Sequence, residues 1–173
     1  MIKVTFLGLL FTIFLFTSSL LAQDNAAGST GAPGCGAPDT KFDVETVEGQ
    51  HPAQPEAGKA LVYFIQDDSE FLSRPRPTTK FGIDGKWVGA THSNSYFYFS
   101  VDPGVHHLCA SWQGWQGTAT DPEAAAHFTA QAGGVYYFGV KNRPTGMSLN
   151  PLDSDEGRLL ANKFSFSTSH PKK

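Results

Sequence analysis

The sequence predicts a single, mainly β domain folded as a β-sandwich of about seven strands, with one short helix near the C-terminus. From residue 41 onward, short segments rich in aromatic and β-branched residues recur between Gly, Pro and Asp turns. Aromatic residues make up 13% of the 173 residues and charged residues only 17%, which argues against a disordered acidic chain or a coiled coil. Only one segment has helical signals, and no repeat at a solenoid or propeller period is visible.

The first 22 residues predict a secretory signal peptide, because a Lys near the start precedes an apolar run from Val4 to Phe16 and then small residues. A membrane anchor is the alternative, but that run is shorter than the roughly 20 apolar residues that span a bilayer. Cleavage is expected after Ala22, and Gln23 follows where a lipid anchor would need Cys. We therefore expect a periplasmic or secreted protein with no transmembrane segment in the mature chain.

Residues 23–40 are rich in Gly, Ala and Pro without periodicity, so they predict a flexible leader. The first strand is expected at 41–47, where apolar and polar residues alternate. A connection with two Pro and two Gly, 48–58, leads to the segment 59–66, KALVYFIQ. Because this segment is almost continuously apolar, it predicts a central strand that is buried on both faces.

The polar segment 67–79 contains two Pro and predicts a surface loop. Strands are expected at 80–83 and 86–89, on either side of an Asp-Gly hairpin turn. Alternation and turn residues predict four further strands at 95–101, 105–112, 124–131 and 135–141.

The helix is expected to begin near Asp153, since N-cap and first-turn acids precede the apolar residues Leu159 and Leu160. The sandwich domain is then expected to cover residues 41–168. Residues 169–173 are expected to form a disordered C-terminal tail.

The only two cysteines are Cys35 in the leader and Cys109 in a predicted strand. Because thiols tend to pair outside the cytosol, the two are candidates for one structural disulfide that pins the leader to the domain. A loop of this length corresponds to at most about 4 kcal/mol of stabilisation. Two free thiols, or a bond to another chain, are the alternatives.

Four segments carry a family likeness: 58–64, 81–110, 132–138 and 153–160. Their order and spacing resemble the bacterial family known as domain of unknown function twenty-eight forty-six. The resemblance implies a small exported protein with a sandwich similar to the prealbumin-like and PEGA-type envelope modules. Many relatives carry a lipobox that this chain lacks. The resemblance implies no activity, since the family has no assigned chemistry.

The resemblance also helps to orient the strand at 105–112. If Leu108 points into the core, the two-residue period of a strand places His106 on the same side and Cys109 on the opposite side. An outward Cys109 would be within reach of Cys35 on a flexible leader.

Composition and motifs exclude several classes of protein. Lys plus Arg number 13 against 16 for Asp plus Glu, a formal net charge of −3 without a basic stripe, so nucleic-acid binding is not expected. There is no G-x-S-x-G elbow, phosphate-binding glycine loop or dinucleotide fingerprint. The cluster Asp67, Asp68 and Glu70 lacks the glycine turn and distal Glu of a calcium loop, so a solvated loop is expected. We therefore expect no catalytic residues, no cofactor and no enzyme activity.

The histidines lack the paired short spacings of a structural metal site, so no metal ligand is expected. His106 and His107 are adjacent on one predicted strand and point to opposite faces. His106 is expected to be a hydrogen-bonded core residue. The other four histidines are His51, His92, His127 and His170.

Tryptophan is the residue type that best suits a ligand contact. Trp115 has Gln-Gly on both sides and is predicted to be exposed, whereas Trp87 and Trp112 are expected to cap the core, with a ligand contact as the alternative. The leading hypothesis is a non-catalytic binding or accessory module of the bacterial envelope that contacts a protein partner. A carbohydrate-binding module with Trp115 as platform is the alternative, and an enzyme of unknown type is a weaker one. The identity of the partner protein or glycan, and the oligomeric state, stay open.

Overall fold

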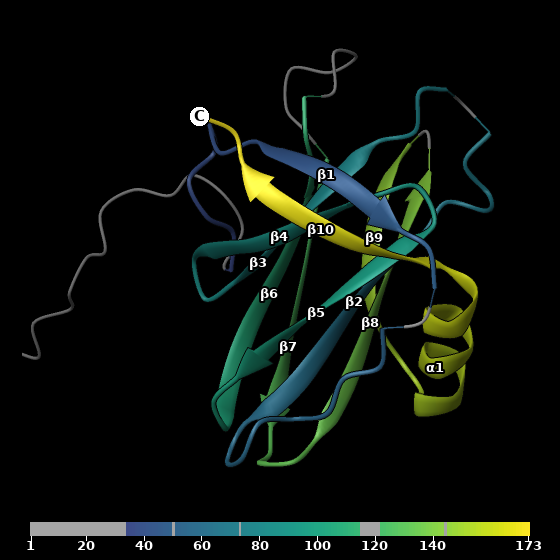
Figure 1. Cartoon of the computed structure of the whole chain (residues 1–173). Coiled ribbons are helices and arrows are strands. Elements are labelled where there is room, and N and C mark those ends of the chain that lie inside the picture. The colour runs from purple at the N-terminus through teal and green to yellow at the C-terminus, as the bar shows by residue number, and fades with distance from the viewer. Residues whose placement is uncertain (1–33, 50, 73, 115–121, 144) are drawn as a thin grey trace, which may run out of the picture.

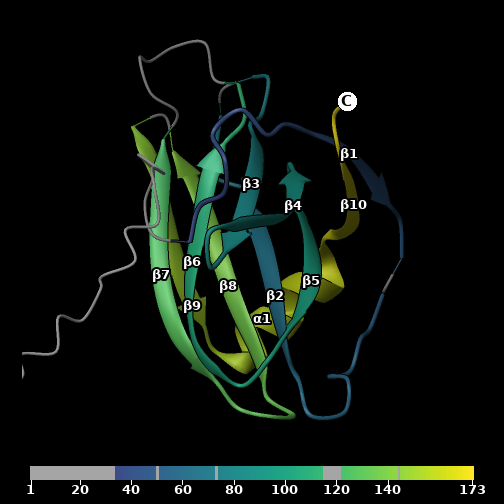
Figure 2. The same ribbon diagram turned by 90° about the vertical axis from the view of Figure 1, so that its left-hand side faces the viewer.

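Two β-sheets pack face to face, and one helix lies against the outer face of the larger sheet in this computed structural model (Figures 1 and 2). The structure describes residues 34–49, 51–72, 74–114, 122–143 and 145–173. In sheet order, the six-stranded sheet contains β1 (Phe42–Val47), β10 (Ser165–Pro171), β5 (Ser95–Val101), β2 (Ala60–Asp67), β8 (Val135–Arg143) and β9 (Gly146–Leu152). The four-stranded sheet contains β4 (Lys86–His92), β3 (Thr78–Ile83), β6 (Gly104–Trp112) and β7 (Glu123–Ala130). The mainly β sandwich with one late helix is confirmed.

The described residues form ten strands rather than about seven. The segments that were not predicted are β9 and β10, whose sequences contain few β-branched residues. Each is stabilised by a neighbour instead: β9 forms an antiparallel pair with β8, and β10 forms one with β1. The disordered tail expected at 169–173 is therefore wrong for residues 169–171, which continue β10 and lie opposite Phe42 to Val44.

Strand β2 is the central strand and is buried on both faces, as predicted. It pairs with β5 on one side and, in parallel, with β8 on the other. Val62 and Phe64 point into the core between the two sheets, whereas Leu61, Tyr63 and Ile65 point toward the helix. Alternation along one strand thus supplies two separate apolar clusters.

Helix α1 (Ser154–Lys163) begins where it was predicted. The Asp153 carboxylate caps it by accepting hydrogen bonds from the backbone N–H groups of Asp155 (2.8 Å) and Glu156 (2.9 Å). The residues buried against the sheet are Gly157 and Ala161, whereas Leu159 is exposed. A Cβ at position 157 would overlap the Tyr137 ring, so the helix can lie this close to the sheet only with small residues on its inner face.

A disulfide joins Cys35 to Cys109, and both residues are buried. The described end of the leader, residues 34–40, therefore covers the outer face of the four-stranded sheet. Trp87 Nε1 donates to the Ala37 carbonyl (2.7 Å), and the Lys80 ammonium lies 4.4 Å from the centre of the Trp87 ring. The leader was expected to be flexible to residue 40, but these contacts hold its last residues on the sheet.

Candidate functional site

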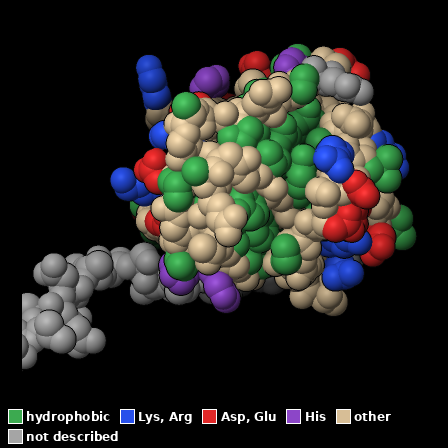
Figure 3. Space-filling model, turned by 90° about the horizontal axis from the view of Figure 1, so that it is seen from below, with side chains coloured by type: hydrophobic (Ala, Val, Ile, Leu, Met, Phe, Trp, Pro, Cys, Tyr) green, Lys and Arg blue, Asp and Glu red, His purple; other side chains and the backbone are tan. Residues whose placement is uncertain are grey.

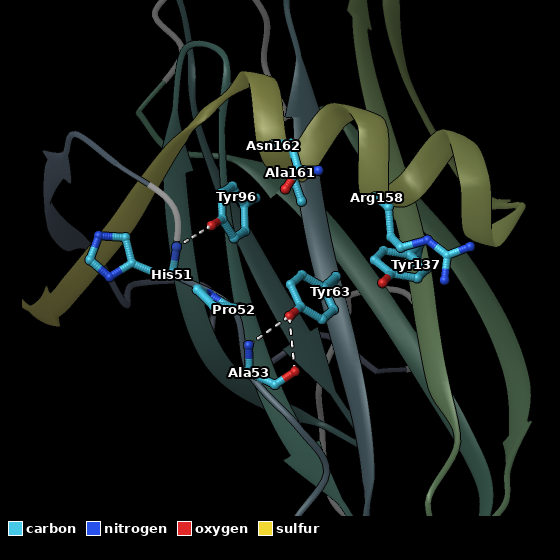
Figure 4. A pocket seen from close by; sticks show the side chains of 9 residues that line it. All are labelled: His51, Pro52, Ala53, Tyr63, Tyr96, Tyr137, Arg158, Ala161 and Asn162. Atoms are coloured by element: carbon cyan, nitrogen blue, oxygen red, sulfur yellow. Dashed lines mark hydrogen bonds between the residues drawn. The ribbon is translucent and has the colours of Figure 1, made fainter.

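Two concave regions stand out in the described residues. One is an open cavity of about 410 Å³ between the two sheets, which we call the open end; Figure 3 views the molecule from that side, from below. The other is a smaller pocket of about 220 Å³ between α1 and the outer face of the six-stranded sheet, which we call the tyrosine pocket (Figure 4). It is lined by His51, Pro52, Ala53, Tyr63, Tyr96, Tyr137, Arg158, Ala161 and Asn162.

Two tyrosines that line the pocket, Tyr63 and Tyr137, belong to a row of rings that strand alternation places on one face of three neighbouring strands. Tyr63 of β2 lies directly opposite Tyr137 of β8 and Tyr98 of β5. The ring centroids of Tyr63 and Tyr137 are 4.9 Å apart, and those of Tyr63 and Tyr98 are 5.4 Å apart. The rings therefore form a continuous row across the sheet, a packing that contributes beyond the buried area alone.

Residues 51–53, which we call the strap, cross one side of the pocket. The backbone N–H of Ala53 donates to the Tyr63 hydroxyl oxygen (3.2 Å), and the Tyr63 hydroxyl donates to the Ala53 carbonyl (3.5 Å). The backbone N–H of His51 donates to the Tyr96 hydroxyl oxygen (3.2 Å) (Figure 4). The His51 ring stacks on Phe166 at 4.7 Å. Two of the three tyrosine hydroxyls are thus used to hold the strap.

The third hydroxyl, that of Tyr137, lies at the other side of the pocket, next to Arg158 (Figure 4). Tyr137 is only 9% exposed, and the hydrogen bonds of the described residues include none to its hydroxyl. Burial raises the Tyr137 pKa above its usual value of 10.0, although the Arg158 charge lowers it. The hydroxyl is therefore protonated at neutral pH and can donate a hydrogen bond.

Two further donors come from α1. Arg158 and Asn162 are four residues apart, so they project from the same side of the helix. One guanidinium nitrogen of Arg158, Nη2, contacts Asp155 Oδ1 at 2.6 Å. Because guanidinium carries five N–H groups, others stay available. The pocket thus combines an aromatic floor with N–H and O–H donors, a set that suits a ring or planar group carrying an acceptor oxygen.

The three predicted tryptophans do not meet in this pocket. Trp115 lies outside the described residues. Trp112 is 1% exposed and donates from Nε1 to Asn142 Oδ1 (2.7 Å) inside the sandwich. Trp87 is half-buried under the leader. Neither Trp87 nor Trp112 therefore presents an open ring face at the pocket.

The acidic segment at 67–70 is not a solvated loop throughout, because Asp68 is fully buried. Its Oδ2 accepts from Gln66 Nε2 (2.6 Å), and its Oδ1 accepts from Asn142 Nδ2 (2.8 Å). Burial raises the pKa of Asp68 above its usual value of 3.8, and these hydrogen bonds act in the opposite direction. The expectation of a solvated cluster is wrong at Asp68, because the carboxylate of a residue just after a buried strand can still turn inward.

The orientation of this buried network is fixed by groups that can only donate or only accept. Trp112 Nε1 can only donate, so Asn142 Oδ1 must face it and Asn142 Nδ2 must face Asp68. The Pro77 carbonyl can only accept, so Gln66 Nε2 faces it at 3.0 Å. Both carboxylate oxygens of Asp68 therefore act as acceptors.

His106 is hydrogen-bonded, as predicted, but the expectation of a core residue is wrong, because it is half-buried and lines the open end. Its Nδ1 is 2.6 Å from Asp84 Oδ2, and its Nε2 is 2.7 Å from the Asp102 carbonyl. Burial lowers the His106 pKa, but these hydrogen bonds and the negative charges of the two Asp residues outweigh it and hold the pKa above 6.5. The Asp84 pKa is lowered below 3.8, because hydrogen bonds from the His107 backbone and the His106 ring outweigh burial.

No group of three or more His, Cys, Asp or Glu side chains in the described part of the chain is arranged to hold a metal ion. No helix among those residues is long and apolar enough to cross a membrane.

The tyrosine pocket was not predicted from the sequence. The alternation of Tyr63, Tyr96, Tyr98 and Tyr137 within their strands was visible. What brings them together is the parallel pairing of β2 with β8 and the position of α1, which depend on contacts between distant segments. A search for tyrosines on one face of adjacent strands could find this floor only once the strand order is known.

Comparison with known proteins gives a family but no function. The family model described as "Protein of unknown function (DUF2846)" matches residues 56–151, which contain the pocket's sheet tyrosines. Neither the curated proteins nor the solved structures include a significant match to the chain. Because the matched segment covers more than half of the chain, the protein belongs to the DUF2846 family.

Proposed function

We propose that this protein is a non-catalytic binding module of the bacterial cell envelope that holds a partner protein through the tyrosine pocket. The observation that carries this proposal is the Tyr137 hydroxyl. It belongs to a residue that is 9% exposed, lines a pocket next to Arg158, and has no hydrogen-bond partner among the described residues. Among the described residues this hydroxyl is not one of the fully enclosed polar atoms that lack a partner, so it is accessible from the pocket and can donate to an incoming acceptor.

The size of the pocket supports an anchor side chain rather than a whole ligand. Its volume of about 220 Å³ is smaller than the roughly 300–1,000 Å³ of typical small-molecule sites. Protein interfaces often depend on a few side chains that fill pockets of this kind. Arg158 disfavours a cationic anchor, and the donors favour an acceptor oxygen, so Tyr, Gln or Glu of the partner would suit the site.

The disulfide supports an envelope location. Cystine is common outside the cytosol and rare within it. The Cys35–Cys109 bond is compatible with a protein that acts beyond the cytoplasm, and the predicted signal peptide points the same way.

A carbohydrate is the second candidate ligand, and one observation favours it. Arg158 and Asn162 lie one helical turn apart above the tyrosine row, so their N–H groups can donate to neighbouring oxygens of one sugar ring. In this alternative the tyrosine pocket, rather than Trp115, provides the aromatic contact.

Crosslinking from within the pocket can distinguish a protein partner from a carbohydrate ligand. A photoreactive amino acid at position 162 in the full chain, irradiated in intact cells, should capture one protein species that mass spectrometry identifies. The same amino acid at position 163, at the exposed end of α1, is the control. Tyr137→Phe should reduce the capture from position 162 several-fold.

A glycan array gives the opposing outcome. Binding of a glycan that is lost in Asn162→Ala and Tyr137→Phe, together with equal capture from positions 162 and 163, would replace the protein partner by a carbohydrate. Equal capture without any glycan binding would contradict both proposals for the pocket.

A further inference from the structure

The open end lies on the opposite side of the six-stranded sheet from the tyrosine pocket, and its floor is apolar. Ile83 and Val88 belong to the β3–β4 hairpin, and Phe99 and Val101 belong to β5. Both sheets therefore contribute to it.

Phe99 shows that the core is incomplete here. Along β5, Phe97, Phe99 and Val101 all lie on the face that points between the sheets, and Phe97 and Val101 are buried in the main core. Phe99 is nevertheless 40% exposed. The β3–β4 hairpin turns back at Asp84, so its strands end before they cover this ring. The result is a cavity of about 410 Å³, within the size range of ligand sites.

The mouth of the cavity carries five ionisable groups, and four of them are paired. Lys59 Nζ lies 3.8 Å from Asp102 Oδ1, and His106 Nδ1 lies 2.6 Å from Asp84 Oδ2. The ion pairs of the described residues include none with Lys86. Both ring nitrogens of His106 face acceptors, an arrangement that a protonated ring satisfies. With that ring charged, the mouth has one positive charge in excess, at Lys86.

We propose that the open end binds a fatty acid, with its alkyl chain on the floor formed by Val88 and Phe99 and its carboxylate next to Lys86. A single chain suits one cavity that is apolar on both sides. A single negative charge matches the one uncompensated cation at the mouth. This site is separate from the tyrosine pocket and does not depend on the function proposed for it.

Calorimetric titration of the oxidised full chain with fatty acids below their micellar concentrations tests the proposal. Each methylene that leaves water should tighten binding about fourfold, so decanoate should bind roughly 15-fold more tightly than octanoate. Decyltrimethylammonium has the same chain length with a positive head group, and it should bind more weakly than decanoate.

Three variants locate the site. Phe99→Glu places a negative charge on the floor and should abolish decanoate binding. Lys86→Gln should weaken the binding of decanoate several-fold and leave the binding of decyltrimethylammonium unchanged. Val105→Glu is the matched control, because Val105 is a 63% exposed strand residue outside the cavity lining, and it should bind decanoate like the wild type. Thermal melts establish that each variant is folded.

Several results would overturn the proposal. They are a folded wild-type protein that does not bind decanoate, a cation that binds as tightly as decanoate, and an equal loss of binding in Val105→Glu and Phe99→Glu. A concentration-dependent dimer that Phe99→Glu abolishes, in a protein that does not bind decanoate, would show instead that a second copy of the chain covers the open end.

Discussion

Two tyrosine hydroxyls on the same face of the sheet have different surroundings and should respond differently to removal. The Tyr63 hydroxyl exchanges hydrogen bonds with the Ala53 backbone, whereas that of Tyr137 faces the pocket. We expect Tyr63→Phe to lower the free energy of unfolding by about 0.5–1.5 kcal/mol, since it releases the strap. Tyr137→Phe should change it by less than about 0.5 kcal/mol. Urea denaturation of both variants checks this, and equal losses would contradict it.

The buried carboxylate of Asp68 should be more important for stability than its exposed neighbours. Asp68→Asn places the new amide NH₂ against the donor N–H of Gln66 or of Asn142. The side-chain amides of Gln66 and Asn142 cannot rotate by 180° to present an oxygen instead, because each would lose its other hydrogen bond, to Pro77 or from Trp112. An unsatisfied buried donor costs about 1–3 kcal/mol. We expect that loss in urea denaturation at pH 7.

Asp67→Asn is the control for that substitution. Asp67 Oδ1 accepts from the Ser69 backbone N–H (3.0 Å), a hydrogen bond that an asparagine oxygen can keep. Asp67 is only half-buried, so its replacement should change the free energy of unfolding by less than about 0.5 kcal/mol. Equal effects at positions 67 and 68 would show that the buried network does not contribute to stability.

At the scale of elements, the closeness of α1 to the sheet depends on Gly157. Alanine is the better helix former by up to about 1 kcal/mol, so Gly157→Ala would stabilise an isolated helix. In the folded protein the added methyl meets the Tyr137 ring, and overpacking of this kind costs about 1–3 kcal/mol. We expect net destabilisation in thermal melts, and weaker partner capture because the helix is displaced from the pocket. Leu159→Ala, on the exposed side of the same helix, should have little effect on stability.

The turns at Asp84 and Asp102 are joined by the His106 ring, which makes their connection depend on pH. The His106 pKa is raised in the fold, so its contribution is fully present below about pH 6.5 and is lost as the pH rises through the raised value. The Asp84 pKa is lowered, so its contribution is present above about pH 3.8 and is lost as the pH falls through the lowered value. The connection is therefore strongest near pH 5.

His106→Gln tests this connection. We expect the variant to be less stable than the wild type by about 1 kcal/mol at pH 5, a modest value because Asp84 is 45% exposed. The difference should be smaller at pH 8, because deprotonation of the ring with rising pH removes this contribution. Urea denaturation at both pH values checks this, and a difference that grows with pH would contradict it. Val105→Glu, which leaves the ring in place, should keep the wild-type profile.

At the scale of the whole molecule, strand periodicity and turn residues predicted most of the sandwich because those signals are local. The central strand β2 and the Asp-Gly hairpin are examples. Strand β10 was missed because SFSTSHP has little intrinsic strand preference, and its stability comes from β1, more than a hundred residues earlier in the chain. The tyrosine pocket and the exposure of Phe99 were missed for the same reason. Each depends on which distant strands become neighbours, and the local sequence of a single segment does not determine that.

The disulfide is the feature that joins the leader to the sandwich, and its removal should affect stability and the leader together. Closing 74 residues of chain stabilises the fold by at most about 4 kcal/mol. We expect the free energy of unfolding of the double variant Cys35→Ser, Cys109→Ser to be about 2–4 kcal/mol lower in urea denaturation, a typical value for a native disulfide. Without the bond, only the hydrogen bonds from Trp87 Nε1 to Ala37 and from Lys80 Nζ to Pro38 and Thr40 are expected to hold the leader. The Trp87 indole N–H should then exchange with solvent at least tenfold faster. Unchanged exchange would mean that the leader packs on the sheet independently of the disulfide.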